Sequence, residues 1–269
     1  MRYVRAVLPA VAGVLCLVCA ACDRAPGYPR PEAEIARPDQ VLDFHALYSQ
    51  NCSGCHGANG RGGAALPLNN PAYLAIAGAD NLRRVTADGI NGTLMPAFAQ
   101  SAGGMLTDQQ VNAVVQGMLN EWSRPAEFAK VSLPPYAANA TPDLAAGQST
   151  FVAACARCHG SDGLGIKPGT HAPSEKGATT FSIVDPTYLA LISNQGMRSI
   201  VMAGHPDPQT PDWRSYAPGG TNPLSPQQIT NVVAWIVSHR SPDSAKAAGD
   251  LHAATQRTQS TNAPRKESK

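Results

Sequence analysis

Apolar residues recur at helical spacing in two parts of the chain that resemble each other. A helix predicted over residues 40–48 carries its apolar residues on one side: Val41, Phe44, Leu47 and Tyr48. A second helix is predicted to begin at Pro142-Asp143, and its apolar residues are Leu144, Phe151 and Val152. Each of the two helices runs directly into a cysteine. The pattern therefore predicts a repeated helical unit.

The repeat continues past these first helices. Helices predicted over residues 82–87 and 197–203 are each closed by a glycine, Gly89 and Gly204. Helices predicted over 111–122 and 229–240 follow N-cap residues, Thr107 and Ser225. Their tryptophans, Trp122 and Trp235, do not stand at equivalent places in the repeat, and we expect both to be packed in the interior. The second copy carries an insertion between residues 165 and 184, which we expect to be a loop.

These elements predict an all-α protein of two tandem domains, residues 39–123 and 142–241. Three other segments are rich in proline or poor in large apolar residues. We predict that residues 22–38 form an extended tether, that 124–141 form a linker over the surface, and that 242–269 form a disordered tail.

The N-terminus is typical of an exported bacterial protein. Basic residues precede an apolar stretch that ends in small residues, so residues 1–21 are predicted to be a signal peptide. Cys22 follows Cys19-Ala20-Ala21, which resembles a lipobox, although Cys19 stands where leucine is usual. Lipidation of Cys22 and ordinary cleavage both stay open. We expect the protein on the periplasmic side of the inner membrane, either lipid-anchored or soluble in the periplasm.

Charge adds little to this picture. The sequence has 21 basic and 19 acidic residues, and two of the basic residues, Arg2 and Arg5, lie in the predicted leader. The mature chain would therefore be close to neutral, which argues against a nucleic-acid partner and leaves electrostatic steering to local patches.

The motif Cys-Xaa-Xaa-Cys-His occurs twice, as Cys52 to His56 and as Cys155 to His159. It is the attachment sequence of a c-type haem. The thiols of Cys52 and Cys55, like those of Cys155 and Cys158, are about one helical turn apart, so each can bond to a haem vinyl group, and the adjacent histidine becomes an axial iron ligand. A four-cysteine zinc site is disfavoured because the pairs are so far apart in sequence. A thioredoxin-like pair would follow a strand, whereas a helix is predicted here.

With these motifs the chain resembles the class I cytochrome c family twice over, across roughly residues 39–241. The resemblance implies two small helical folds, each around a covalently bound haem c. In the first domain, Leu94-Met95-Pro96 is similar to the axial-methionine segment of that family, which makes Met95 the sixth ligand of the first iron.

The second domain departs from that pattern. Thr210 stands where Met95 would be expected, and Pro211 is retained. Three outcomes stay open: a five-coordinate iron, ligation by His205, or ligation by Met202. Helical spacing counts against Met202, because it lies on a different face from Met197 and Val201. We expect the two haems to differ in coordination and in potential.

The leading hypothesis is a dihaem c-type cytochrome that transfers single electrons in a respiratory chain outside the cytoplasm. It would have redox proteins as donor and acceptor, and we expect it to act as a carrier rather than an enzyme. One alternative is a dihaem peroxidase-like enzyme with an open second haem. Another is the cytochrome subunit of a larger dehydrogenase or oxidase complex.

Overall fold

The computed structural model describes residues 36–166, 182–206, 210–215 and 223–241. It divides into two compact units, Met1–Gln40 and Val41–Lys269. In the first unit, the described residues form a short 3-10 turn, η3 (Pro38–Gln40). The predicted signal peptide, Cys22, the tail and all of the tether except residues 36–38 lie outside the described residues.

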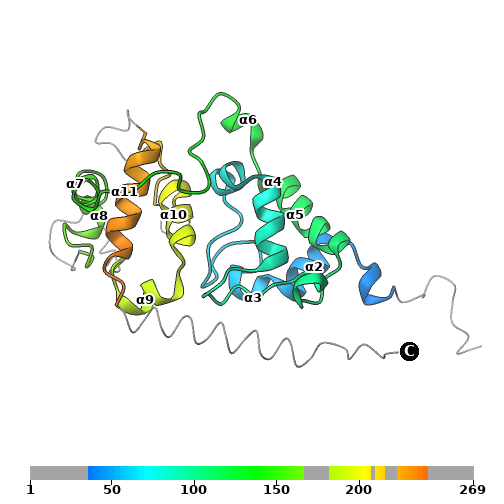
Figure 1. The fold of residues 1–269 in the computed structure, drawn as a ribbon. Coiled ribbons are helices and arrows are strands. Elements are labelled where there is room, and N and C mark those ends of the chain that lie inside the picture. Colours follow the sequence, from blue (N-terminus) through cyan, green and yellow to red (C-terminus); the bar gives the residue numbers. More distant parts are fainter. Residues whose placement is uncertain (1–35, 167–181, 207–209, 216–222, 242–269) are drawn as a thin grey trace, which may run out of the picture. The chain divides into compact units, whose positions relative to one another are not determined.

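The second unit is helical (Figure 1), as the sequence predicted. Apart from two isolated bridges, its described residues contain no strand. The helices of its N-terminal half are α2 (Phe44–Asn51), α3 (Ser53–His56), α4 (Pro71–Asp88), η4 (Gln100–Ala102), α5 (Asp108–Trp122) and α6 (Pro125–Phe128). Those of its C-terminal half are α7 (Leu144–Ala154), α8 (Ala156–His159), α9 (Pro186–Leu191), α10 (Asn194–Ala203) and α11 (Pro226–Val237).

Side-chain caps set most of the helix starts. Thr107 and Ser225 form capping boxes at α5 and α11, where these N-caps were predicted. Asp143 caps α7 by accepting a hydrogen bond from the amide of Ala146. Asp43 caps α2 by accepting a hydrogen bond from the amide of Ala46. Helix α2 therefore begins at Phe44, and the predicted start at residue 40 is wrong.

The middle helical segment is broken in both halves, but the break is within one helix in the first half and between two helices in the second. Helix α4 is interrupted at Gly78, which has φ 66° and ψ 166°. The corresponding break in the second half lies between α9 and α10, where Ser193 caps the new helix. Gly89 and Gly204 close α4 and α10, which confirms the predicted helix ends.

In each half the first helix packs on the last: α2 on α5, and α7 on α11 (Figure 1). At each close approach a glycine on one helix lies opposite an aromatic residue on the other. The glycine is on the last helix in the first half and on the first helix in the second half. In the first half, a Cβ on Gly117 of α5 would lie 2.1 Å from the ring of Phe44 on α2. In the second half the glycine is on α7, where a Cβ on Gly147 would lie 3.0 Å from the Cβ of Trp235 on α11.

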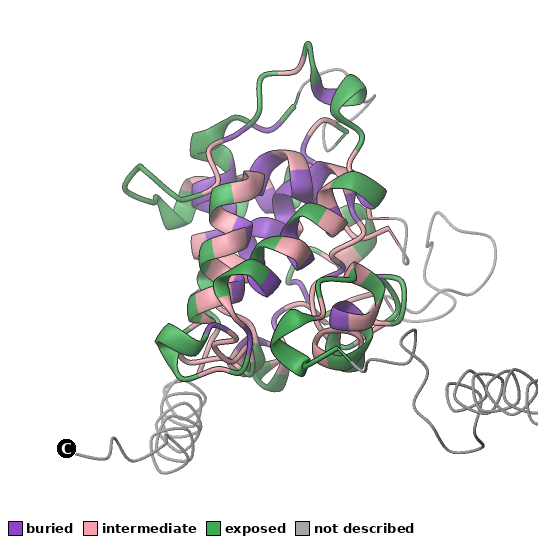
Figure 2. Cartoon of the chain, turned by 90° about the vertical axis from the view of Figure 1, so that its right-hand side faces the viewer, coloured by how far each residue is buried: buried purple, intermediate pink, exposed green. Residues whose placement is uncertain are grey.

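Buried apolar residues of both halves belong to one core cluster, which occupies the inward faces of the helices (Figure 2). Trp122 and Trp235 are both buried in it, as expected. The linker also contributes to this cluster, because Phe128 of α6 is buried and Tyr136 packs against the core. The linker therefore does not simply run over the surface: Phe128 stacks on Trp213, with ring centroids 6.4 Å apart.

Candidate haem sites

The first Cys-Xaa-Xaa-Cys-His motif forms the end of α2 and all of α3. Cys52 is the C-cap of α2, and its amide donates to the carbonyl of Tyr48. The imidazole of His56 is buried, and its Nδ1 lies 2.7 Å from the carbonyl oxygen of Leu66. When Nδ1 carries the proton for this bond, Nε2 keeps its lone pair for a metal. Burial also lowers the pKa of His56, which favours the neutral, ligating form.

The chain after His56 turns so tightly that two of its glycines, Gly57 and Gly63, leave no room for a side chain. Gly57 has φ 82°, and a Cβ there would lie 1.7 Å from the carbonyl oxygen of Arg61. A Cβ on Gly63 would lie 2.1 Å from the carbonyl oxygen of Cys55. The hydroxyl of Tyr48 donates to the carbonyl of Gly57 and ties this loop to α2. The loop therefore holds His56 in one place.

The first cysteine of each motif does not have the properties of a reactive redox thiol. All four motif cysteines are free in the structure. Burial raises the pKa of the Cys52 thiol to about 11 and that of Cys155 to about 12, and the second cysteine of each motif adds to the rise. Redox-active pairs instead have lowered thiol pKa values. Within the described residues, no three His, Cys, Asp or Glu side chains come together as a metal site.

Met95 lies in a turn that closes α4. We call residues 89–98 the Met95 turn. The amide of Ile90 donates to the carbonyl of Met95, and a Cβ on Gly89 would lie 2.7 Å from that same oxygen. Met95 is half-buried, while Leu94 beside it is 62% exposed. Ligation of the first iron by Met95 stays a prediction.

The second motif repeats the local structure of the first. Cys155 is the C-cap of α7, and α8 contains Cys158 and ends at His159. Gly160 follows with φ 74°. The apolar side chain of Leu164, in the next turn, is 63% exposed, much like Leu94 in the first half. Most of the predicted insertion, residues 167–181, lies outside the described residues.

Thr210 occupies the backbone position of Met95. We call residues 204–206 and 210–214 the Thr210 turn. His205 and Thr210 exchange backbone hydrogen bonds of 3.1 and 3.0 Å, and a Cβ on Gly204 would lie 2.3 Å from the carbonyl oxygen of Thr210. A threonine hydroxyl is not among the usual axial ligands of haem. The position therefore offers the second iron no methionine.

The other two candidates for the second sixth ligand differ in their surroundings. Met202 is buried, and its carbonyl accepts from the amide of Trp213, just as that of Ala87 accepts from Phe98 in the first half. Met202 thus takes the place of Ala87, inside the core. His205 is half-buried and lies within the Thr210 turn itself. Neither ligation follows from these contacts, and both stay predictions.

These residues fit a covalently bound haem. Each motif has its first cysteine at the end of one helix, and its second cysteine and histidine in the short helix that follows. In the first half that histidine is oriented by the backbone carbonyl of Leu66.

Comparison with known protein families supports the same cofactor. Residues 39–116 match the family model "Cytochrome C oxidase, cbb3-type, subunit III", and residues 144–240 match "Cytochrome c". The chain carries two tandem cytochrome c-type domains. Such domains imply covalently bound haem c, and the two motifs fall one in each domain.

Three relatives are named as cbb3-type cytochrome c oxidase subunits. CcoP of Rubrivivax gelatinosus is 25% identical over 78% of this chain and 58% of its own length. FixPc of Rhizobium leguminosarum bv. viciae is 32% identical over 45% of this chain and 39% of its own. CcoP of Azospirillum sp. (strain B510) is 26% identical over 50% of this chain and 49% of its own. The two cytochrome domains thus span about half the length of the relatives they match.

A solved structure, a chain of the reducing HAO-like protein complex of Kuenenia stuttgartiensis, matches with a TM-score of 0.43 and 18% identity. The match covers 77% of this chain and 100% of the Kuenenia chain. A likeness this slight carries no conclusion about function.

Sequence reasoning missed Asn70, which joins the two cytochrome domains, and it missed Arg198 and Arg214, which join the second domain to the linker. The place of Asn70 before Pro71 is typical of an N-cap. No sequence signal indicates its contacts with the second domain, because these depend on how the domains pack.

Proposed function

We propose that the chain is a dihaem electron-transfer protein that passes single electrons along a respiratory chain outside the cytoplasm. The observation that carries this proposal is the position of the two haem motifs, one at the end of the first helix of each cytochrome domain. When bound, each haem supplies an iron that changes by one electron between its ferric and ferrous states.

The residues of this chain would hold and orient those irons. Cys52, Cys55, Cys155 and Cys158 would bind the two haems covalently, while His56 and His159 would be the proximal ligands. The hydrogen bond from His56 Nδ1 to Leu66 would fix the imidazole and raise its basicity. Met95 would complete the first site as the sixth ligand. Its thioether would raise the reduction potential of the histidine-ligated haem.

The acceptor we propose is a terminal oxidase complex. The names of the three relatives support this, since all are oxidase subunits, and the first family model is that of a cbb3 oxidase subunit. In the described part of the chain, every helix is too short or too polar to cross a bilayer. Membrane attachment through a lipid on Cys22 remains part of the proposal.

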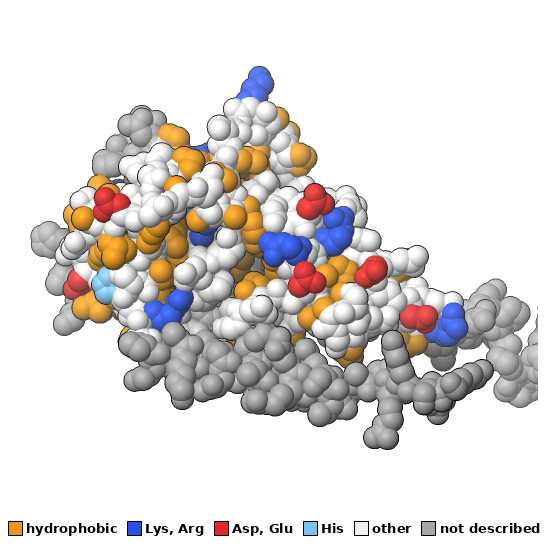
Figure 3. Space-filling model, in the orientation of Figure 1, with side chains coloured by type: hydrophobic (Ala, Val, Ile, Leu, Met, Phe, Trp, Pro, Cys, Tyr) orange, Lys and Arg blue, Asp and Glu red, His pale blue; other side chains and the backbone are white. Residues whose placement is uncertain are grey.

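Docking to such a partner would depend on local charge. On the face shown in Figure 3, basic and acidic side chains are interspersed, as expected from the near-neutral mature composition. We therefore expect the association rate to fall only modestly when ionic strength is raised.

A second candidate function rests on Thr210. Because this residue occupies the position of Met95, the second iron would be open if neither His205 nor Met202 binds it. An open haem iron can bind small ligands such as peroxide, and a neighbouring high-potential haem could supply electrons. That arrangement would make the protein a peroxidase-like enzyme.

One experiment separates these functions. The purified oxidised protein is examined by optical and EPR spectroscopy, its haem is quantified per chain, and carbon monoxide is added after reduction. The carrier proposal expects two haems per chain that are both low-spin and do not bind carbon monoxide. A high-spin signal near one haem per chain, with carbon monoxide bound to that half, would instead support the enzyme. A haem-free, folded protein would contradict both.

Two variants assign the signals to their domains. Met95→Leu removes the predicted sixth ligand of the first haem while keeping an apolar side chain of similar size. We expect carbon monoxide to bind about one further haem per chain in this variant. Thr210→Met supplies a thioether at the equivalent place, and we expect it to abolish any carbon monoxide binding at the second haem.

A further inference from the structure

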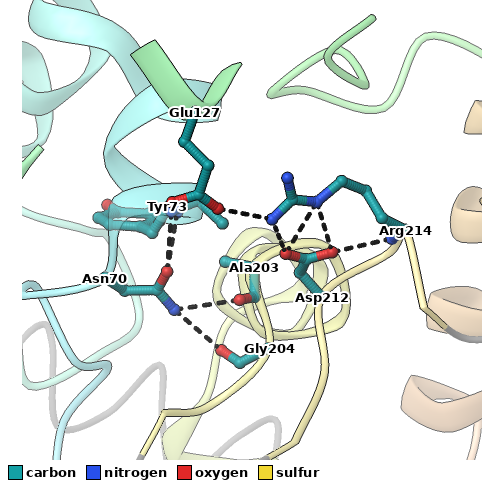
Figure 4. A network of polar contacts seen from close by, with 8 residues as sticks. Asn70, Tyr73, Glu127, Ala203, Gly204, Asp212 and Arg214 are labelled. Carbon is teal, nitrogen blue, oxygen red and sulfur yellow. Dashed lines mark hydrogen bonds and ion pairs between the residues drawn. The ribbon is translucent and has the colours of Figure 1, made fainter. Parts of the chain in front are cut away.

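Asn70 caps two helices that belong to different cytochrome domains. Its Oδ1 accepts hydrogen bonds from the amides of Ala72 and Tyr73, at 3.0 and 3.2 Å, and so caps the start of α4. Its Nδ2 donates to the carbonyl oxygens of Ala203 and Gly204, at 3.1 and 3.2 Å, where α10 ends (Figure 4). Only 5% of Asn70 is exposed. Carbonyls at a helix C-terminus lack partners within the helix, so Asn70 satisfies groups that would otherwise be buried unpaired.

The cap alone does not require an asparagine. In the second domain the equivalent residue is Asp185, whose Oδ1 accepts from the amides of Thr187 and Tyr188 at 2.9 and 3.0 Å. An ionised carboxylate accepts hydrogen bonds but has no N–H to donate. The amide of Asn70 is therefore needed for its second task, which is the contact with α10.

That contact fixes the start of the Thr210 turn. Gly204 is the first residue of the turn, and the next residue, His205, pairs through its backbone with Thr210. Thr210 stands where Met95 stands in the first domain. Asn70 therefore holds the backbone that flanks the predicted sixth-ligand position of the second haem.

A residue of the linker holds the other end of the same turn. Arg214 bonds to Asp212 within the turn and to Glu127 of α6, at 2.6 and 2.9 Å (Figure 4). Its guanidinium also lies 4.7 Å from the ring centroid of Phe128. Both ends of the Thr210 turn are thus held by residues that precede the second domain.

On its own side, Asn70 is close to the histidine of the first motif along the chain. It follows Leu66 by four residues, and the carbonyl of Leu66 holds His56. The contact therefore joins the segment that follows the first haem motif to the turn that contains Thr210.

We propose that Asn70 is a positioning residue for the second haem site. Its side-chain amide holds the Thr210 turn, so the first cytochrome domain controls the geometry on the sixth-ligand side of the second haem. This inference rests on the proposed function, because it assumes a haem bound at Cys155 and Cys158.

The test uses the full-length, haem-loaded protein with the variants Asn70→Ser and Asn70→Asp. Both residues are good helix N-caps, so α4 keeps its cap, but neither replaces the two bonds from Nδ2. Asp185→Asn is the matched control, since it exchanges the same two residue types at a cap whose hydrogen bonds lie within α9. The readouts are amide hydrogen exchange at His205 and Thr210 and redox titration of both haems.

We expect both Asn70 variants to retain two haems. Exchange protection at His205 and Thr210 should fall about tenfold, which corresponds to losing roughly one net hydrogen bond. The second haem should change its potential while the first does not, and Asp185→Asn should match the wild type. If exchange protection and the second potential both stay at wild-type values in Asn70→Ser, the inference is wrong.

The same data separate this inference from the proposed function. A wild-type protein without haem would overturn the proposed function, and with it the role assigned to Asn70. Two haems with no response to the Asn70 variants would overturn the role of Asn70 alone.

Discussion

Gly89 and Gly204 end their helices in a backbone conformation that other residues rarely adopt. Their φ values are 69° and 70°, with ψ of −167° and −175°. This region of φ and ψ is almost exclusive to glycine. Both glycines also leave no room for a side chain, because the carbonyl of Met95 or Thr210 lies directly against them. The two predicted sixth-ligand positions therefore depend on a glycine six residues earlier.

We expect Gly204→Ala to destabilise the protein by about 3 kcal/mol, the sum of the backbone strain and the clash with Thr210. Gly92→Ala is the control: Gly92 has φ 73°, but a Cβ there meets nothing within 4 Å. Only the backbone cost remains in that variant, about 1 kcal/mol. Denaturant unfolding of both variants measures the difference, and equal losses would contradict the role of the close contact.

At this scale the sequence is informative, because caps and stops are local. The N-caps Thr107 and Ser225 and the stops Gly89 and Gly204 were all predicted from residue type and position. The start of α2 was missed, since Val41 fits the apolar spacing although Asp43, the residue that caps the helix, comes after it. Periodicity cannot separate a helical residue from an apolar residue just before the helix.

The pairs α2–α5 and α7–α11 pack through a glycine and an aromatic residue that exchange places. Phe44 faces Gly117 in the first domain, and Gly147 faces Trp235 in the second. The sequence alone shows that Trp122 and Trp235 are not equivalent, but it does not show why. The reason needs the crossing points of the helices, which are contacts between residues far apart in the chain.

We expect Gly147→Ala to destabilise the second domain by about 2 kcal/mol, although alanine favours helices by about 1 kcal/mol over glycine. The added Cβ would lie 2.2 Å from the backbone carbonyl oxygen of Asn231, which cannot move without shifting α11. In Gly117→Ala the obstacle is the side chain of Phe44, which can rotate. This second variant should lose less stability in thermal unfolding, and the opposite order would contradict the packing argument.

On the scale of the whole molecule, a buried arginine of the second domain holds the linker through hydrogen bonds. Arg198 is 2% exposed, and its guanidinium donates to the carbonyls of Pro135 and Tyr136 and to the hydroxyl of Thr230, at 2.9, 3.0 and 3.1 Å. Burial lowers the pKa of Arg198. Its counterpart in the first domain, Arg83, is 40% exposed and bonds to Asp80 and Asn112.

We expect Arg198→Met to destabilise the protein by about 3 kcal/mol, because the buried guanidinium's bonds to Thr230 and to the linker are lost, and the carbonyl of Pro135 loses its donor. Limited proteolysis should then cut near residues 135–136 more readily. Arg83→Met should lose less than about 1 kcal/mol, as is usual for an exposed ion pair. Unchanged stability and proteolysis in Arg198→Met would contradict a structural role for the linker.

The linker was the least predictable part of the fold. Its prolines, including Pro134 and Pro135, correctly indicated little regular structure, yet Phe128 and Tyr136 pack into the core. Composition reports whether a segment can form helices, but not which surface it covers. Boundaries of the two domains, the leader and the identity of the second sixth ligand stay predictions.

The reversed glycine and aromatic residue also bear on how a tandem repeat avoids misfolding. Repeated domains can exchange equivalent elements during folding, which produces swapped structures. Pairing α2 with α11 would bring Phe44 against Trp235, and pairing α7 with α5 would leave Gly147 facing Gly117. One wrong pair would be overfilled and the other would contain a void, and both defects are costly in a packed core. Each first helix is thus matched in shape to the last helix of its own domain. We expect the poor fit of the exchanged pairs to disfavour helix swapping between the two cytochrome domains as the chain folds.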